Sequence, residues 1–156
     1  MLRLTNHVAE RIKRHARLAY PDECCGFLFG TSDGDLKHAS RLFELANASG
    51  RNRSRRFLIK PGEFRNAELW ARGKSLEVVG LYHSHPDHPA RPSQFDLDHA
   101  LPWWSYVIIS VEQGTPSMLT SWVLKDDRSE FVEEVVVGAG VTALKVSGGV
   151  VEQRME

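Results

Sequence analysis

Short apolar runs bounded by turn residues make up much of this chain, and they limit it to folds in which strands outnumber helices. The clearest runs are Cys24–Gly30, Val78–Tyr82, Tyr106–Val111 and Met118–Leu124. Runs of this length that stop at glycine, proline, serine or aspartate predict strands. Three further strands are predicted at Leu36–Leu45, Phe57–Ile59 and Phe131–Val137.

Two longer segments predict helices. Within Thr5–Tyr20, the apolar residues Val8, Ile12 and Ala16 recur at helical spacing, with charged residues between them. Pro61–Gly73 begins with proline and ends with glycine, which are typical of the start and end of a helix. Six or seven strands with helices spaced among them predict an α+β or α/β domain, in which helices flank a curved mixed sheet.

The chain has 156 residues and equal numbers of basic and acidic side chains, 20 of each. This length suits a single core, and we expect one domain over residues 1–137 and a flexible, glycine- and valine-rich tail over 138–156. With no net charge, the protein has no global field that would attract nucleic acid or an anionic membrane. We therefore expect neither of them as a partner.

Two features predict a cytoplasmic protein. No apolar run approaches the roughly 20 residues that cross a bilayer, and Met1–Leu4 lacks the apolar centre of a secretion signal. Cys24 and Cys25 are adjacent, so a disulfide between them would be strained and would close almost no loop. We expect both thiols to be reduced and buried, as suits a reducing compartment.

The run Val78–Tyr82 leads directly into His83–Ser84–His85. Histidines two residues apart on a strand project from the same face, about 6.6 Å apart along the backbone, so both rings can reach one metal ion. Alone this is a weak signal, because seven histidines are available in the chain. Solvent-facing histidines at a strand end are the alternative interpretation.

Ser93–Gln94–Phe95–Asp96 predicts the start of a helix that ends near Leu101. Ser-x-x-Asp is close to a capping box, in which both side chains accept hydrogen bonds from backbone amides. Together with the histidines, Asp96 also supplies the ligand type missing from a three-ligand catalytic zinc site, which keeps a fourth position for water. The combination favours the metal site, with the cap as the alternative.

Glu23 is the candidate base. A dication lowers the pKa of a coordinated water to about 7, but a nearby carboxylate must still accept and relay protons. Glu23 immediately precedes the run Cys24–Gly30, where a carboxylate is poorly solvated and useful mainly if it faces a site. The alternative is an exposed loop charge beside Asp22.

These residues match a known family. Glu23, then His83–Ser84–His85, seven residues, Ser93, two residues and Asp96 resembles the signature of the JAMM, or MPN-plus, metalloproteases. Glu23–Cys24–Cys25–Gly26 is similar to the glutamate-bearing strand of that family. The resemblance covers roughly Leu4 to Val137, is closest to short prokaryotic members, and shows no departure at the five key positions.

The resemblance implies a single MPN-type domain and a zinc peptidase or isopeptidase. His83, His85 and Asp96 would bind Zn²⁺, Glu23 would deprotonate the water and protonate the leaving amine, and Ser93 would donate a hydrogen bond to the oxyanion. The substrate would be a ubiquitin-like or sulfur-carrier protein, cut after its C-terminal glycine. Its extended C-terminus could add as a strand to a sheet edge.

Three other interpretations compete with this one. His83–Ser84–His85–Pro86–Asp87–His88 matches the His-x-His-x-Asp-His motif of metallo-β-lactamases, but no histidine follows His99 to complete their site. A zinc deaminase needs a separated cysteine pair after its histidine, and both cysteines here precede the histidines. A scaffold of the same fold that has lost its metal remains the alternative from another class, although the five key residues argue against it.

Two further segments have two interpretations each. The segment Ser49–Arg56 carries four arginines without interleaved aromatic residues, so it predicts a solvated loop that could help to dock an acidic carrier protein. Those arginines are Arg51, Arg53, Arg55 and Arg56. Trp103 and Trp104 could form a substrate platform, but core packing is favoured for such a pair. We interpret Gly148–Gly149 as a coincidental match to the diglycine of carrier proteins.

Overall fold

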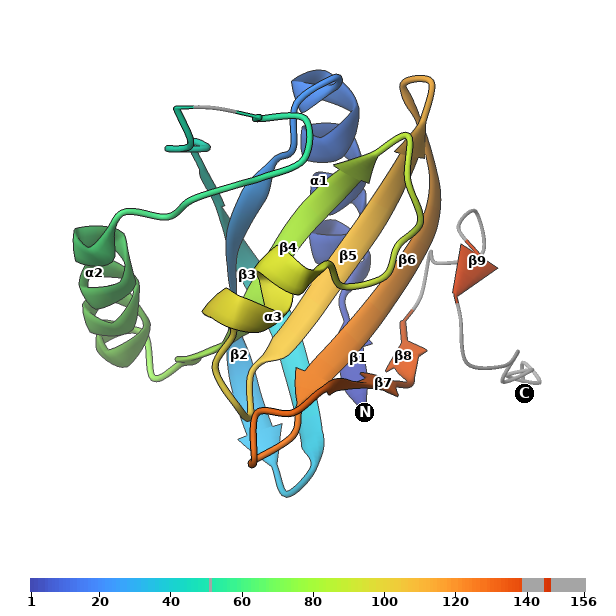
Figure 1. The fold of residues 1–156 in the computed structure, drawn as a ribbon. Helices are drawn as coiled ribbons and strands as arrows, with labels where there is room; N and C mark the ends of the chain where they lie inside the picture. Colours follow the sequence, from blue (N-terminus) through green and yellow to red (C-terminus); the bar gives the residue numbers. More distant parts are fainter. Residues whose placement is uncertain (51, 139–144, 147–156) are drawn as a thin grey trace.

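The computed structural model describes residues 1–50, 52–138 and 145–146. This part of the chain forms one mixed sheet with three helices (Figure 1). The elements, in chain order, are β1 (Leu2–Leu4), α1 (Asn6–Ala19), β2 (Cys25–Asp33), β3 (Leu36–Leu45), α2 (Pro61–Gly73), β4 (Glu77–Pro86), α3 (Gln94–His99), β5 (Ser105–Glu112), β6 (Thr115–Leu124), β7 (Phe131–Glu134), β8 (Val136–Val137) and β9 (Lys145–Val146).

The strands lie in the order β7-β6-β5-β4-β2-β3-β1-β8, and β9 pairs separately with β6. β4 lies between antiparallel β2 and parallel β5. The strand that carries both histidines is therefore central, with neighbours on each side. The expected α+β architecture, a curved mixed sheet with flanking helices, is confirmed.

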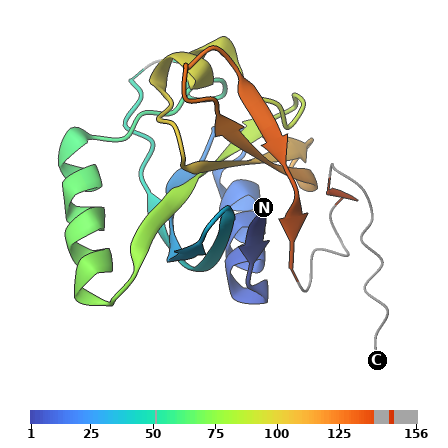
Figure 2. The same ribbon diagram turned by 90° about the horizontal axis from the view of Figure 1, so that it is seen from below.

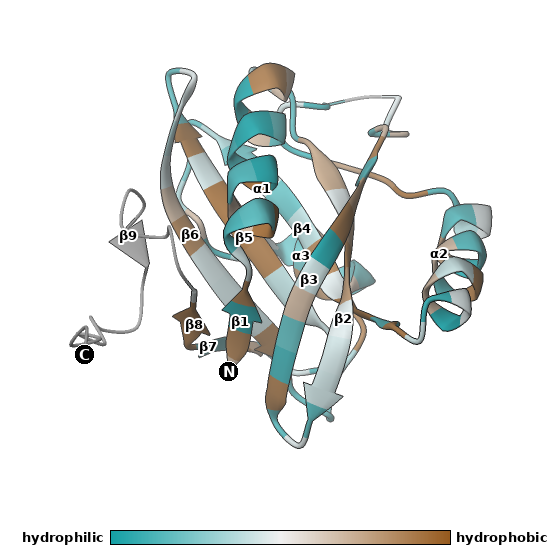
Figure 3. Ribbon diagram, turned by 180° about the vertical axis from the view of Figure 1, so that it is seen from behind, coloured by the Kyte–Doolittle hydropathy of each residue, from teal (hydrophilic) through white to brown (hydrophobic). Residues whose placement is uncertain are grey.

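Helices cover both faces of the sheet, and the side chains of β2 alternate between them. Leu28 belongs to the apolar cluster under α1, together with Val8 and Ile12. Phe27 and Phe29 belong to the cluster on the opposite face, which also contains side chains of α2. Figures 2 and 3 show α1 and α2 on opposite sides of the sheet. Since each strand residue faces one layer or the other, the short apolar runs bury both faces.

The predicted first helix is confirmed, with its ends where the sequence places them. Thr5 is the N-cap, and its hydroxyl accepts a hydrogen bond from the amide of Val8 at 3.3 Å. Val8, Ile12 and Ala16 are buried, as their spacing predicts. The segment Pro61–Gly73 forms α2 over the whole predicted range.

One predicted strand is wrong. Phe57–Ile59 forms no strand. Among the residues that the structure describes, its one backbone–backbone hydrogen bond stays within the loop, where the carbonyl of Leu58 accepts from the amide of Ala48 at 2.9 Å. The amide of Leu58 donates to the side chain of Asn47 at 3.2 Å. The segment is extended and apolar, as a strand would be, but it forms no hydrogen-bonded ladder with a described strand of the sheet.

The predicted strand Phe131–Val137 divides in two. β7 pairs antiparallel with β6, whereas β8 pairs parallel with β1 at the other end of the sheet order. The short strand β1 and the pairing of β9 with β6 were not predicted from the sequence. Of the predicted tail, Gly138 and Lys145–Val146 are described, while Gly148–Gly149 and the other residues lie outside the described part of the chain.

The remaining sequence expectations about burial have mixed outcomes. Cys24 and Cys25 are buried free thiols, as expected. Trp104 packs against Phe64 with parallel rings 6.0 Å apart, whereas Trp103 is exposed and carries the ammonium of Lys37 over its ring at 5.0 Å. Within the described residues, no helix has the length and apolar character needed to cross a bilayer.

Candidate metal centre

His83 and His85 project from the end of β4 into one buried site. Each is 1% exposed, and their Nε2 atoms are 3.1 Å apart. Ser84, between them, points to β2: its hydroxyl accepts from the amide of Cys24 at 2.8 Å, and its amide donates to the carbonyl of Cys24 at 3.1 Å. The period of two along the strand thus aims both imidazoles at one point, as the sequence predicts.

Asp96 serves as a helix cap and faces the histidines with the same oxygen. The capping box of α3 is complete: the hydroxyl of Ser93 accepts from the amide of Asp96 at 3.1 Å, and Asp96 Oδ2 accepts from the amide of Ser93 at 2.8 Å. That Oδ2 also lies 3.3 Å from His83 Nε2 and 3.4 Å from His85 Nε2. The two sequence interpretations of Asp96 are therefore compatible.

The three atoms form a triangle of the size that a small tetrahedral cation requires. Its sides are 3.1, 3.3 and 3.4 Å. A tetrahedral ion with ligands at about 2.0–2.1 Å separates neighbouring ligand atoms by about 3.3–3.4 Å. Two nitrogens and one carboxylate oxygen, all buried, therefore could hold a metal ion by one face of a tetrahedron.

The ring of His85 is oriented by the loop that follows β4. Its Nδ1 lies 2.7 Å from the carbonyl of Pro89. A carbonyl only accepts, so Nδ1 carries the proton and Nε2 presents its lone pair to the triangle. The next carbonyl in the loop, that of Ala90, accepts from the hydroxyl of Thr120 at 2.7 Å, and the indole of Trp122 donates to that hydroxyl at 2.8 Å. β6 thereby holds the loop that orients His85.

The surroundings of Asp96 favour its charged form. Burial alone would raise the pKa of Asp96, but the charge of His83, the neighbouring imidazoles of His83 and His85, and the backbone amide of Ser93 hold it well below its usual range. His83 is oriented differently from His85: its ring stacks on that of Phe57, with centroids 4.6 Å apart. Phe57 was predicted as part of a strand, so the sequence did not indicate this role.

Glu23 enters the same site from the segment just before β2. Cys25 pairs with His83 across the antiparallel β2–β4 ladder, so the residue two positions earlier arrives beside His85. Glu23 is 2% exposed. Burial raises the pKa of Glu23 to about 8, with a lowering contribution from His85 and a raising one from Asp96. The exposed loop charge considered from the sequence is therefore wrong, and a cation in the triangle would favour ionisation of this carboxyl.

The arginine-rich loop holds Glu23 in place. The amide of Glu23 donates to the carbonyl of Arg53 at 2.6 Å, and the side-chain amide of Asn47 donates to the carbonyl of Glu23 at 3.1 Å. The segment is a loop, as expected, and Arg51 lies outside the described residues. The sequence did not indicate that Asn47 or Arg53 would hold Glu23, because contacts with backbone groups leave no motif.

His88 is a further neighbour that the site predicted from the sequence did not include. Its ring stacks on that of His85 at 4.1 Å, and its Nε2 is 3.9 Å from Glu23 Oε1. Glu23, His85 and His88 form a second group that could hold a metal ion. The only signal for it in the sequence was the overlapping His-x-His-x-Asp-His motif.

A narrow apolar cavity of about 240 Å³ opens beside His83 and Asp96. Phe57–Ile59 forms one wall, and Phe95 forms another. Within the described residues, the amides and carbonyls of Phe57 and Ile59 have no hydrogen-bond partner. An extended segment with unpaired backbone groups therefore borders the triangle.

Residues 5–125 match the family described as prokaryotic homologs of the JAB domain. The chain belongs to this family. The JAB assignment agrees with the JAMM/MPN resemblance noted from the five key residues, and it covers every one of them.

Two relatives of this JAB chain match it over different shares of their own length. A desampylase of Pyrococcus furiosus is 32% identical over 115 residues, which is 74% of this chain and 76% of the desampylase. Tail tip assembly protein K of Escherichia phage N15 is 33% identical over 98 residues, which is 60% of this chain. The match spans only 36% of the phage protein.

Solved structures share the fold of this JAB domain. A protein of Desulfitobacterium hafniense superimposes with a TM-score of 0.77 at 33% identity, covering 94% of this chain and 96% of that one. A protein of Salinibacter ruber gives 0.68 at 42% identity, covering 90% and 94%. A JAB1/MPN domain protein of Archaeoglobus fulgidus gives 0.51 at 22% identity, covering 87% and 97%, and so supports the fold alone.

Proposed function

We propose that this protein is a zinc-dependent hydrolase that cuts a peptide or isopeptide bond after the C-terminal glycine of a ubiquitin-like or sulfur-carrier protein. One observation carries the proposal: the donor atoms of His83, His85 and Asp96 form a buried triangle of tetrahedral size, with the carboxyl of Glu23 beside it. Such a triangle leaves a fourth position for water, as catalytic zinc sites do. The relative named desampylase supports a ubiquitin-like substrate.

Zinc fits this donor set better than magnesium or calcium does. Magnesium and calcium prefer oxygen ligands and six or more of them, whereas two imidazoles and one carboxylate suit zinc. A zinc ion held there would polarise the scissile carbonyl and acidify a water molecule. His83, His85 and Asp96 are the proposed ligands.

Glu23 and Ser93 would perform the proton transfer and the charge stabilisation. Glu23 accepts a proton from the attacking water and delivers it to the leaving nitrogen. The water oxygen bonds to the glycine carbonyl carbon, the C–N bond breaks, and the products are a carboxylate and an amine. The hydroxyl of Ser93 already accepts from the amide of Asp96, so its proton is available to the oxyanion.

The extended segment Phe57–Ile59 is the proposed docking edge for the carrier tail. Its unpaired backbone groups can form a ladder with an added strand, and the adjoining cavity of about 240 Å³ is lined in part by His83 and Asp96. Glycines lack side chains, so their backbone can approach these ligands closely. The arginines of the same loop could then meet acidic groups of the carrier at the rim.

The test combines metal analysis with cleavage of a defined substrate. We expect one zinc per chain in the purified protein, and loss of a C-terminal extension from a β-grasp carrier that ends in Gly-Gly plus added residues, followed by mass spectrometry. Glu23→Gln is expected to keep zinc and lose turnover. Glu68→Gln, an exposed carboxylate on α2, is the matched control.

Two results would overturn the proposal. Full activity of Glu23→Gln would remove the assigned base. A protein without stoichiometric zinc, whose stability and activity are indifferent to a chelator, would support the alternative of a metal-free scaffold.

A further inference from the structure

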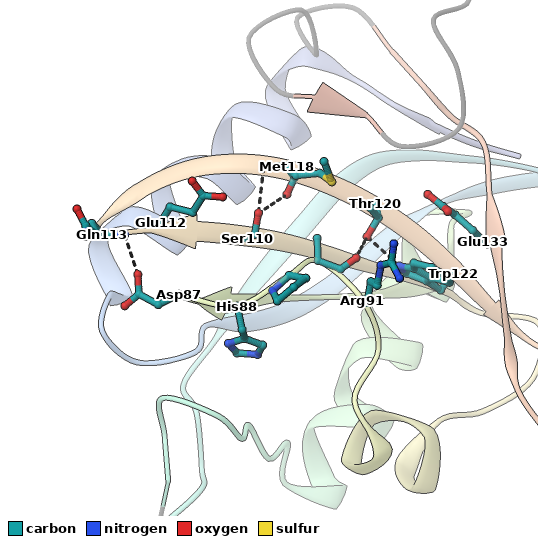
Figure 4. A pocket seen from close by; sticks show the side chains of 12 residues that line it. Asp87, His88, Arg91, Ser110, Glu112, Gln113, Met118, Thr120, Trp122 and Glu133 are labelled. Atoms are coloured by element: carbon teal, nitrogen blue, oxygen red, sulfur yellow. Dashed lines mark hydrogen bonds between the residues drawn. The ribbon is translucent and has the colours of Figure 1, made fainter.

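A second and larger cavity, of about 760 Å³, lies between the loop after β4 and strands β5, β6 and β7 (Figure 4). Its walls include His88 and Arg91 from the loop, Met118 and Trp122 from β6, and Glu133 from β7. The volume lies in the range of pockets that enclose small ligands, about 300–1,000 Å³. No sequence motif indicated this cavity, because its walls come from segments that are distant in the chain.

The cavity adjoins the candidate metal centre on the side of Glu23. His88 lines the cavity, stacks on His85 and has its Nε2 3.9 Å from the carboxylate of Glu23. The narrow apolar cavity is lined instead by His83 and Asp96. The two cavities therefore border the site on different sides, and His88 is the residue that links the larger cavity to Glu23 and His85.

Two charged groups of the cavity have no partner of their own. Asp87 is occupied, since its carboxylate accepts from the hydroxyl of Tyr20 at 2.6 Å and the amide of Gln113 at 2.7 Å. By contrast, Arg91 is exposed, and its guanidinium makes no hydrogen bond or ion pair within the described residues. Glu133 Oε1 is buried and also has no hydrogen-bond partner there. Glu133 pairs with Trp122 across the β6–β7 ladder, and both residues line the cavity together with Arg91 (Figure 4).

We propose that this cavity binds the segment released by the cut, a short carboxylate-terminated peptide of about one to three residues, with Arg91 as the group that recognises its terminal carboxylate. The proposal rests on the proposed function, since it assigns the amine side of the same reaction. Arginine pairs with carboxylates in two parallel hydrogen bonds, which suits a free C-terminus.

The other walls fit the rest of such a peptide. Glu133 Oε1 accepts from an internal N–H group of the peptide, and Trp122 and Met118 face an apolar side chain. A lysine isopeptide linked to a folded protein would enter as a narrow alkyl chain and would bring no carboxylate to Arg91. The bounded volume and the unpaired guanidinium thus favour a trimmed tail as the leaving group.

The test uses one carrier protein with two tails that differ at one group. Both end in Gly-Gly-Ala-Phe, one with a free C-terminal carboxylate and one with a C-terminal amide. We expect kcat/KM to be about tenfold higher for the acid, as for one partly exposed charge pair. Arg91→Gln should reduce the acid-to-amide ratio to about one, Arg91→Lys should retain part of the preference, and Arg72→Gln on α2 should leave the ratio as in the wild type.

A binding measurement separates this inference from the proposed function. Acetyl-Ala-Phe and its amide are titrated into the zinc-loaded protein, and the indole N–H of Trp122 is followed by NMR. The acid is expected to bind about tenfold more tightly, and Arg91→Gln is expected to remove the difference. Absence of cleavage with this binding preference intact would count against the proposed reaction alone. Equal cleavage of the two tails, or equal binding of the two peptides, would overturn the pocket assignment.

Discussion

Replacing Glu23 by glutamine should stabilise the metal-free protein, and the gain should grow with pH. The pKa of this carboxyl is raised by burial from 4.5 to about 8. The folded state therefore holds the proton more tightly than the unfolded state. The stability that this provides is complete below pH 4.5 and is lost as the pH rises towards 8.

The magnitude follows from these two values. In the unfolded chain, pH 7 is 2.5 units above the Glu23 pKa of 4.5, so ionisation of this carboxyl lowers the free energy of the unfolded state. In the folded protein the same carboxyl stays mostly protonated at pH 7, because its pKa is about 8. At about 1.4 kcal/mol per unit, wild type loses about 3 kcal/mol between low pH and pH 7. Glutamine has no proton to lose, so Glu23→Gln should avoid that loss and unfold about 9 °C higher at pH 7.

The assay is thermal or denaturant unfolding of both proteins in chelator at pH 4.5 and pH 7. Comparing the variants at the same pH removes the contribution of the histidines, which both share. Glu68→Gln, on the exposed face of α2, should show no such pH dependence. If Glu23→Gln and wild type differ equally at both pH values, Glu23 ionises in the fold as freely as in the unfolded chain, and its place beside the candidate metal centre is wrong.

Three further predictions concern the groups around the triangle. Asp96→Asn should abolish zinc binding in equilibrium dialysis. It should change the free energy of unfolding by about 1 kcal/mol or less, because the amide oxygen can still accept the hydrogen bond from the amide of Ser93. Zinc retained by this variant would exclude Asp96 as a ligand. Ser93→Ala should lower kcat by about 10²–10³ and stability by about 1 kcal/mol, measured by cleavage and by unfolding; unchanged kcat would leave it only the role of a cap. Thr120→Val should weaken zinc affinity about tenfold in chelator competition, because it removes the hydroxyl that binds the carbonyl of Ala90. Thr120→Ser keeps this hydroxyl and should keep the affinity. Equal affinities of the two variants would show that the loop orients His85 without β6.

The sequence determined the features that depend on local geometry. The period of two along an apolar run places His83 and His85 on one face of a strand. The period of 3.6 in Thr5–Tyr20 identifies the buried side of α1, and the pattern Ser-x-x-Asp identifies the start of α3. Such features need only the chain geometry of neighbouring residues, so an isolated sequence contains them.

Only the tertiary structure decided which of these features meet. Glu23 lies 62 residues before His85 and comes to lie beside it because β2 runs antiparallel to β4, a pairing that no local pattern specifies. The support of Glu23 by Arg53 and of His85 by Pro89 consists of backbone carbonyls, which every residue has and no motif records. The segment Phe57–Ile59 is an example of a local pattern that the tertiary structure overrides. Its apolar residues suit a strand, but within the described part of the chain it pairs with no strand of the sheet, and Phe57 stacks on His83 instead.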